Sequence, residues 1–458
     1  MSPPGPSEPS IIQKVRYLRD PLGYISECQR TYGDIFTIQL AKNGMVIVCT
    51  PELAKAVYTA GDDVLVAGEA KLTLFGKLLG QYSTLLLDGP PHLKRRRLLL
   101  PRFRGELMHK FGPVMIEACK RTLDEMPRDR AFALHPHLHH IAFEVILRAL
   151  FAATPSDRID ALRSTLYAFA TKAVTSRLLM FPPLQRDFGP LSPWGRVARI
   201  VAQSRTVLVD EIARRRRAGV ETDDITGLLL AARHDDGSGL SDEEIRDEIL
   251  TMVAAGHETT SIALAWLCHA VFTRPNVLAK LLDELAAKPI GDGKRIDELT
   301  YLDAVARESL RFNTLIPNGS GRLVKRDFEL GGHRIPAGAM VSVAFHLIHR
   351  RPDVFERPDE FLPERFLSKK YSPYESIAFG GGSRRCIGMP FALYEMKLVL
   401  AKLLEEFRLE VRQDGVRPTW RGMFLTPNKG LMVRVRPHPQ RRDLERTSVE
   451  RTMETSGA

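Results

Sequence analysis

The sequence predicts a mainly α-helical fold with a smaller β-containing lobe, built as a single domain. Residues 91–310 are almost wholly helical in their hydrophobic period, whereas short alternating stretches precede and follow them. No stretch rich in Gly, Ser or Pro divides the middle of the chain. Both ends are polar and aperiodic, so we expect one domain over residues 21–437, between a poorly ordered N-terminal segment (1–20) and a disordered C-terminal tail (438–458).

The β-containing lobe is predicted from two separate stretches. Residues 33–50 alternate around an Asn-Gly pair, as a hairpin does, and Pro51 then begins a short helix. Residues 327–346 return to short strands with turns at Gly-Gly and Pro-Ala-Gly. We expect these strands to form the smaller lobe.

One predicted helix has clear ends. Ser241 followed by Glu244 forms a capping box at its start, and Pro275 ends the helical pattern after Arg274. A helix of about 33 residues is about 50 Å long, the diameter of a whole domain. Its middle carries Glu258 beside a histidine, and ionisable groups are costly inside a bilayer. We therefore expect a buried helix that crosses the core rather than a membrane span.

Net charge and cysteine content limit the possible partners and cellular compartment of the protein. The net charge of +11 can serve nucleic acid, anionic lipid or an acidic protein, but the sequence has no zinc-finger spacing and no RNP-like aromatic motif, which argues against nucleic acid. Five cysteines without any Cys-x-x-Cys spacing indicate a reducing compartment. The N-terminus lacks the pattern of a signal peptide. We expect a cytoplasmic protein without a membrane anchor.

Cys386 has an unusual surrounding for a single cysteine. Arg384 and Arg385 precede it, glycines lie on both sides, and a helical pattern begins just after it. Positive charge and a helix N-terminus both favour the thiolate over the thiol. A thiolate held in this way can attack a substrate, bind iron, or do neither.

The residues around this cysteine resemble the haem-ligand signature of the cytochrome P450 monooxygenases. Three further motifs follow the order found in that family: an oxygen-helix motif at 255–260, an E-x-x-R pair at 308–311, and a P-E-R-F segment at 363–366. The resemblance implies a cytochrome P450-like fold with a single haem domain, of the soluble bacterial type. The residues that carry the signature are Phe379, Gly382, Arg384, Cys386 and Gly388.

The resemblance also implies how the chain would hold its cofactor, haem b. Cys386 would be the axial ligand of the iron, with Phe379 packed beside the haem and Gly382 and Gly388 allowing backbone N–H groups to approach the sulfur. Haem propionates are carboxylates, which arginine binds well. The candidates for this binding are Arg384, Arg322, His92 and Arg96.

Glu258 and Thr259 are the catalytic candidates that the resemblance implies. In the family, an acid and an alcohol at these positions relay protons toward dioxygen, while His257 stands at a variable position and is not expected to be catalytic. A threonine in a helix can bond back to a carbonyl one turn earlier. We also expect Glu308, Arg311 and Arg365 to form a buried charge network that holds the cysteine loop.

Residues 135–140, HPHLHH, have the composition of a metal-binding tract. No Cys, Asp or Glu lies among them, so we expect a helix start with solvated histidines instead.

The resemblance further implies hydroxylation or epoxidation of a lipophilic small molecule such as a terpenoid, fatty acid or steroid, using O2. Electrons would come from a separate ferredoxin or flavodoxin with its reductase, steered by a basic surface, and we expect a monomer. Alternatives are a peroxygenase or an isomerase on the same haem fold, a non-catalytic haem-binding protein, or a nucleic-acid-binding protein. The residues expected at the basic surface are Arg95, Arg97, Arg385 and Lys397.

Overall fold

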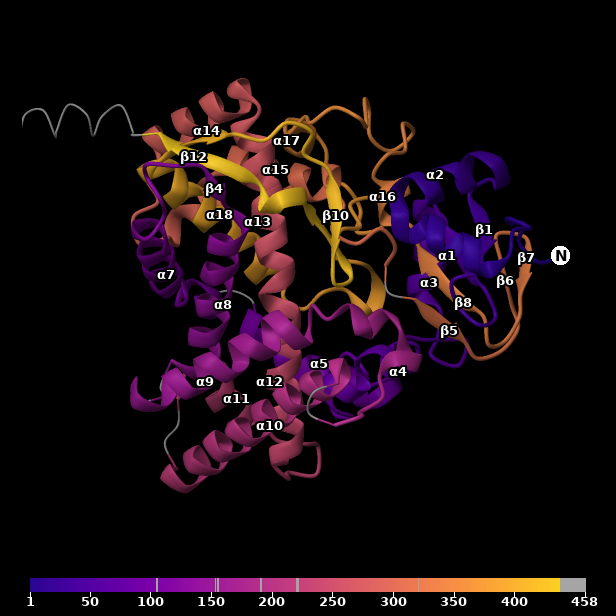
Figure 1. Ribbon diagram of the computed structural model, residues 1–458, viewed down its shortest axis with the longest axis horizontal. Helices are drawn as coiled ribbons and strands as arrows, with labels where there is room; N and C mark the ends of the chain where they lie inside the picture. The colour runs from indigo at the N-terminus through magenta and orange to yellow at the C-terminus, as the bar shows by residue number, and fades with distance from the viewer. Residues whose placement is uncertain are drawn as a thin grey trace, which may run out of the picture.

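A helical region and a smaller sheet-bearing lobe make up the computed structural model, in which residues 1–436 are described apart from 104–105, 153, 155, 190–191, 220–221 and 320. In Figure 1 the lobe lies at one end of the molecule with α1, α2 and α3, and the helices fill the other end. The fold therefore has the predicted class. The predicted C-terminal tail, 438–458, lies outside the described residues.

The helices follow one another with short connections. They are α1 (Ser10–Arg19), α2 (Pro21–Tyr32), α3 (Pro51–Thr59), α4 (Gly68–Leu79), α5 (Gly89–Leu99), α6 (Glu106–His109), α7 (Gly112–Asp124), α8 (His135–Phe151), α9 (Ser156–Ala168), α10 (Pro193–Ala218), α11 (Ile225–Ala231), α12 (Asp242–Gly256), α13 (Glu258–Phe272), α14 (Pro275–Ala287), α15 (Thr300–Phe312), α16 (Phe345–Ile348), α17 (Arg365–Ser368) and α18 (Met389–Glu406).

The strands form small sheets, of which the largest has the order β1-β2-β8-β5-β3. The predicted hairpin is present, because β1 and β2 pair antiparallel, and β2 also pairs parallel with β8. The strands are β1 (Ile35–Ile38), β2 (Met45–Val48), β3 (Leu65–Val66), β4 (Phe132–Ala133), β5 (Arg322–Val324), β6 (Phe328–Leu330), β7 (His333–Ile335), β8 (Met340–Val343), β9 (Arg408–Val411), β10 (Pro418–Arg421), β11 (Phe424–Pro427) and β12 (Met432–Arg436).

The N-terminal segment differs from the prediction of a poorly ordered tail. Residues 10–19 form α1, and Gln13 on this helix is fully buried. Its side-chain amide donates to the carbonyl of Glu8 at 2.8 Å, and its Oε1 accepts from the backbone N–H of Gln39 at 2.8 Å. A polar residue in an aperiodic stretch suggested exposure to solvent, but Gln13 makes its hydrogen bonds inside the protein.

The long central helix is interrupted beside Gly256, where the sequence allows a local opening of the helix. The capping box of Ser241 and Glu244 is present, but α12 ends at Gly256 and α13 begins at Glu258. The hydroxyls of Thr259 and Thr260 donate to the carbonyls of Ala255 and Gly256, at 2.7 and 2.8 Å. Such back-bonding bends helices because the carbonyls gain a second partner.

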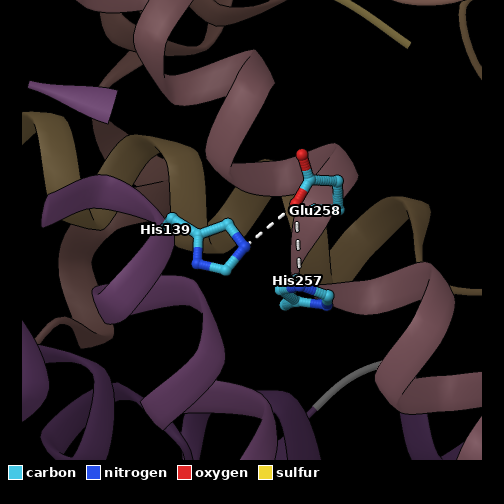
Figure 2. Close-up of side chains that lie close together, drawn as sticks. All are labelled: His139, His257 and Glu258. Carbon is cyan, nitrogen blue, oxygen red and sulfur yellow. Dashed lines mark hydrogen bonds and ion pairs between the residues drawn. The ribbon is translucent and has the colours of Figure 1, made fainter. Parts of the chain in front are cut away.

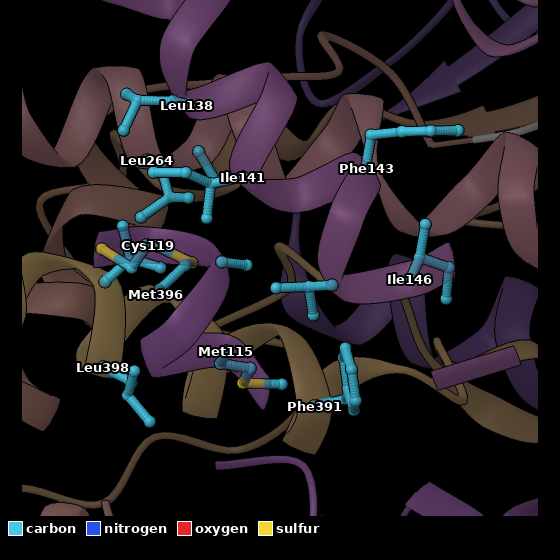
Figure 3. Close-up of a cluster of buried hydrophobic side chains, with 14 of the residues drawn as sticks. Met115, Cys119, Leu138, Ile141, Phe143, Ile146, Leu264, Phe391, Met396 and Leu398 are labelled. Atoms are coloured by element: carbon cyan, nitrogen blue, oxygen red, sulfur yellow. The ribbon is translucent and has the colours of Figure 1, made fainter. Parts of the chain in front are cut away.

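The core is formed where α7, α8, α13 and α18 meet (Figure 3). Their apolar side chains are excluded from solvent, as the helical period predicts. Within the described part of the chain no single helix is long and apolar enough to cross a membrane, although α12–α13 together with the bent α14 passes that test as a pair. The core residues shown include Met115, Cys119, Leu138, Ile141, Leu264, Met396 and Leu398.

Candidate functional site

The cysteine loop closes on itself just before α18. The backbone N–H of Cys386 donates to the carbonyl of Phe379 at 3.0 Å, and the N–H of Arg385 donates to the carbonyl of Gly382 at 3.2 Å. Met389 then begins α18, so the sulfur lies near a helix N-terminus as expected. Phe379 is partly buried and packs against the helical core. The loop therefore brings Phe379 and Cys386 together.

The surroundings of Cys386 act on its thiol in opposite directions. Cys386 is exposed, but the surrounding protein still desolvates its thiol and raises the pKa, whereas the backbone N–H groups of Gly388 and Met389 and the charges of Arg96 and Arg385 lower it. The helix N-terminus and the positive charge therefore favour the thiolate as predicted, while desolvation opposes them. A metal ion that bonds the sulfur supplies the missing positive charge.

Two glycines of the signature have different structural roles. Gly382 has φ +64°, and a Cβ there would lie 2.0 Å from the carbonyl oxygen of Tyr58 on α3. Gly388 has an ordinary φ of −77°, and the nearest atom to an added Cβ is the Cys386 sulfur at 3.9 Å. Only Gly382 needs glycine for the backbone to fit.

The predicted charge network is present and fully buried. Arg311 donates to both carboxylate oxygens of Glu308, at 2.7 and 2.8 Å, and Arg365 donates to Glu308 at 3.3 Å. Arg311 also donates to the carbonyl of His349, whose Nε2 accepts from the backbone N–H of Ile377 at 3.0 Å. Ile377 lies two residues before Phe379, so the network supports the start of the cysteine loop.

Three of the predicted propionate partners are buried or nearly so. Burial and the charges of Arg384 and Arg96 lower the pKa of His92 to about 3, and burial lowers the pKa of Arg384 to about 10 despite the opposing charge of Asp88. Arg322 lies over the Tyr58 ring at 5.2 Å. Arg96 is half-buried, and its charge also acts on Cys386. The three arginines, the neutral His92 and the sulfur therefore lie in one region.

Lys71 and Asp88 belong to the same region and were missed from the sequence. Lys71 is buried, and burial together with the charges of Arg322 and Arg384 lowers its pKa to about 7. Asp88 pairs with Arg384 at 2.5 Å and accepts the N–H groups at the start of α4. Lys71 stands in an apolar stretch that carries no motif. Asp88 precedes the Gly-Pro-Pro start of α5, and this was its only signal.

Thr259 lies on an accessible face of the central helix. Ala255 is exposed, and Gly256 and Thr259 are half-exposed, although the helix on either side is buried. The Thr259 hydroxyl donates to the carbonyl of Ala255, the backward bond expected for this residue. A hydroxyl on such a face can exchange this bond for one to a small molecule or a water.

The Glu258 side chain points away from the accessible face of Thr259, toward α8, and is fully buried (Figure 2). Its Oε2 lies 2.9 Å from His139 Nε2, and its Oε1 accepts from Arg421 Nε at 2.5 Å. Burial opposes ionisation of Glu258, but the His139 hydrogen bond and the Arg421 charge prevail and lower its pKa to about 2. Glu258 is therefore a carboxylate held between two partners that sequence reasoning did not identify.

The expectation of solvated histidines in 135–140 is wrong for two of them. His135 and His139 are buried, whereas His140 is exposed. His135 Nε2 lies 3.3 Å from the Ser261 hydroxyl, and His139 contacts Glu258. Both partners are on α13, far along the chain, so a local pattern could not reveal them.

The comparisons with known proteins agree with this geometry. The sequence model described as Cytochrome P450 matches residues 3–435. The chain belongs to the cytochrome P450 family. It is therefore a cytochrome P450 monooxygenase with a haem iron as cofactor, and the predicted fold class is confirmed.

Mycobacterial cytochromes P450 are among its relatives. Putative cytochrome P450 138 of Mycobacterium bovis is 36% identical over 439 residues, which cover 95% of this chain and 96% of that protein. Putative cytochrome P450 135B1 of Mycobacterium tuberculosis is 35% identical over 458 residues, which cover 97% and 93%. The likeness extends over nearly the whole of both chains.

Solved cytochrome P450 structures share the fold. The heme domain of cytochrome P450DA superposes with a TM-score of 0.81 at 24% identity, covering 96% of this chain and 98% of that one. Retinoic acid-bound cyanobacterial CYP120A1 superposes with a TM-score of 0.80 at 23% identity, covering 93% and 96%.

The residues present fit the haem that this cytochrome P450 requires. In the described part of the chain, Arg322 Nη2 and Arg384 Nε are buried without a hydrogen-bond partner. A buried donor without an acceptor is unfavourable, and so is the mutual repulsion of Lys71, Arg322 and Arg384. A bound anion with acceptor oxygens would relieve both. Two propionate carboxylates would be anions of this kind. The Cys386 sulfur would therefore hold the iron, and the cation region would hold the propionates, of one haem.

The basic surface expected to steer a redox partner is smaller than predicted. Arg95 is buried and pairs with Glu244 at 2.5 Å, and Lys397 is buried and pairs with Asp297 at 2.8 Å. Their charges are therefore neutralised inside the cytochrome P450 and cannot steer. Arg97 is exposed and Arg385 is half-buried. These two remain from the predicted set.

Proposed function

We propose that this cytochrome P450 oxidises a lipophilic small molecule, such as a terpenoid, fatty acid or steroid, by hydroxylation or epoxidation. Electrons would come from a separate ferredoxin or flavodoxin and its reductase. The observation that carries the proposal is the common location of Cys386 and the buried cations, linked by Arg96, whose charge acts on both. We further propose that the cofactor is haem b, since the chain lacks the Cys-x-x-Cys-His motif of covalent haem attachment.

In this proposal the iron and the propionates of the haem are held by different parts of the chain. Cys386 would bond the iron, and the N–H groups of Gly388 and Met389 would orient the sulfur. The buried arginines and Lys71 would hold the propionates. When bound, the haem iron supplies the binding and reductive activation of dioxygen. The Glu308 network would keep the cysteine loop in position.

Proton supply is assigned to two neighbouring residues. The Thr259 hydroxyl would leave the Ala255 carbonyl and donate at the accessible face, while the Glu258 carboxylate would receive protons from solvent and pass them on through water. Arg421, whose side chain is 38% exposed, connects Glu258 with the surface. The substrate would lie against Ala255, whose apolar side chain is exposed beside Thr259.

The ligand assignment is tested by the spectrum of the reduced, carbon monoxide-treated protein. The unmodified protein should show the red-shifted Soret band of thiolate ligation, and Cys386→Ser should lose it. Cys28→Ser is the control, since Cys28 is buried in a separate hydrophobic cluster with residues of β1 and β2. A red-shifted band retained in Cys386→Ser would contradict the proposal.

The role of Thr259 is tested by the coupling of electron use to product. A substrate would first be found by titrating lipophilic compounds and following the haem absorbance. Thr259→Ala should bind that substrate normally but divert most of the electrons from NAD(P)H to hydrogen peroxide. Thr260→Ala is a matched control, because Thr260 makes the same backward bond but is buried. Equal coupling in both variants would refute the role.

A further inference from the structure

Three side chains meet at the break between α12 and α13. His139 of α8 faces His257 and Glu258, and the nearest ligand atoms of the three residues all lie within 4.8 Å of one another. All three side chains are buried. Figure 2 shows the two imidazole rings on the same side of the carboxylate, with a dashed line from each to Glu258.

His257 presents an unused ligand atom to this cluster. Its Nδ1 lies 2.7 Å from the carbonyl of Val253, so Nδ1 carries the proton and donates it. Its Nε2 then has a lone pair, and this atom is buried without a hydrogen-bond partner in the described part of the chain. It lies 3.7 Å from Glu258 Oε2. Two acceptors therefore face each other across a gap.

The main chain orients the His257 ring toward the cluster. The Val253 carbonyl fixes the ring orientation, as the backbone carbonyl partners of metal-binding histidines do.

We propose that His139 Nε2, His257 Nε2 and Glu258 Oε2 form a binding site for a divalent zinc-type cation. When the metal binds, the proton that His139 Nε2 shares with Glu258 moves to His139 Nδ1, so that Nε2 has a lone pair for the metal. Zinc bonds nitrogen and carboxylate oxygen at about 2.0–2.2 Å, which in tetrahedral geometry separates the ligands by about 3.3 Å. The distances of 2.9 and 3.7 Å from Glu258 Oε2 to the two nitrogens lie on either side of that value. A water would complete the coordination.

The ligand set selects the kind of metal. Two of three ligands are imidazole nitrogens, which suit zinc rather than magnesium or calcium. Arg421 occupies Glu258 Oε1 and leaves Oε2 for the metal. Since Arg421 is partly exposed while the ligands are buried, its movement would open the path by which the ion enters.

Metal binding would also act on the reaction, and this consequence alone rests on the proposed function. Zinc on Oε2 would remove Glu258 from proton supply, so turnover would slow. The occupation of the site itself is independent of turnover and is measured without substrate.

The test uses the untagged, haem-loaded protein, incubated with zinc chloride and dialysed against a weak chelator. We expect one zinc per haem iron, and zinc K-edge absorption should show two imidazole nitrogens and carboxylate oxygen at about 2.0–2.2 Å. His139→Gln and His257→Gln should each weaken binding at least tenfold. His140→Gln is the matched control, because His140 is the exposed neighbour on α8, and it should retain full binding.

Two results would overturn the site: no zinc retained by the unmodified protein, or equal zinc retained by His257→Gln. If either variant fails to fold, the zinc K-edge spectrum of the unmodified protein still shows whether two imidazole nitrogens and a carboxylate oxygen bind the zinc. Zinc should then slow product formation in the unmodified protein more than in His257→Gln. Zinc bound at the site without any effect on turnover would leave the site standing and count against proton supply through Glu258.

Discussion

Glu308 and Glu298 both pair with an arginine three residues away, and the two pairs differ in burial. Glu308 and Arg311 are excluded from solvent, whereas Arg295 and Glu298 are about half exposed. Removing one partner of a buried pair leaves an uncompensated charge, at a cost of about 3–5 kcal/mol. An exposed pair contributes little because water already solvates both groups.

We therefore expect Glu308→Ala to yield little haem-loaded protein, because Arg311, Arg365 and the backbone N–H of Leu362 lose their shared acceptor. Glu298→Ala should load haem normally. The measurement is the ratio of Soret to protein absorbance after purification in parallel. Normal loading of Glu308→Ala would show that the network does not hold the cysteine loop.

Residues whose partners are near in sequence were the predictable ones. The capping box of Ser241 and the backward bond of Thr259 depend on three or four neighbouring residues, and both are present. The partners of Glu258 are 119 and 163 residues away, on α8 and β10. No local pattern encodes them, so the histidines at 135–140 could not be separated into buried and solvated ones.

At the scale of elements, the cysteine loop depends on the close approach of its short 3-10 helix, η6 (Gly382–Arg384), to α3. Gly382 combines a positive φ with a Cβ position 2.0 Å from the Tyr58 carbonyl oxygen. Gly415 also has a positive φ, of +61°, but nothing lies within 4 Å of an added Cβ. An alanine at Gly415 would therefore cause backbone strain alone, whereas an alanine at Gly382 would cause backbone strain and a steric clash.

Gly415→Ala should cost about 1 kcal/mol of unfolding free energy, the usual penalty of a left-handed conformation. Gly382→Ala should cost several times more and reduce haem loading, because the loop must shift away from α3. Denaturant unfolding monitored by the Soret band gives both values. Equal effects of the two substitutions would indicate that the loop moves freely.

The central helix shows that hydrophobic period predicts where a helix lies but not where it is interrupted. Its apolar pattern and its start at Asp242 were predictable, since both depend on local sequence. Its interruption at His257 depends on back-bonding by Thr259 and Thr260 and on the bond from His257 to the Val253 carbonyl. These interactions leave the hydrophobic period unchanged, so the period alone gives one continuous helix, and only Gly256 and the back-bonding threonines indicate where it can open.

At the scale of the whole molecule, buried neutral histidines make stability depend on pH. Burial lowers the pKa of His257 to about 4 and of His135 to about 3, and it lowers the pKa of His349 well below 6.5. The unfolded chain binds these protons near pH 6.5 while the folded protein does not. Their contribution to stability is therefore complete above pH 6.5 and is lost as the pH falls toward 4.

At pH 5 each such histidine should lower the unfolding free energy by about 2 kcal/mol relative to pH 7.5. Carboxylates with a lowered pKa act only at more acidic pH, since Glu211, at about 2, loses its contribution below pH 4.5. Urea unfolding at the two pH values measures the effect. His349→Gln should reduce the difference and His140→Gln should not, while equal stability at both pH values would contradict the assignment.

The pairing of β2 with β8 has a consequence for the order of assembly during synthesis. Met45 lies beside Met340 in a parallel ladder, so the hairpin of β1 and β2 leaves the ribosome long before its neighbour exists. At 5–20 residues per second the delay is about 15–60 s. During that time one edge of the hairpin carries unpaired backbone groups, open to mispairing with another nascent chain.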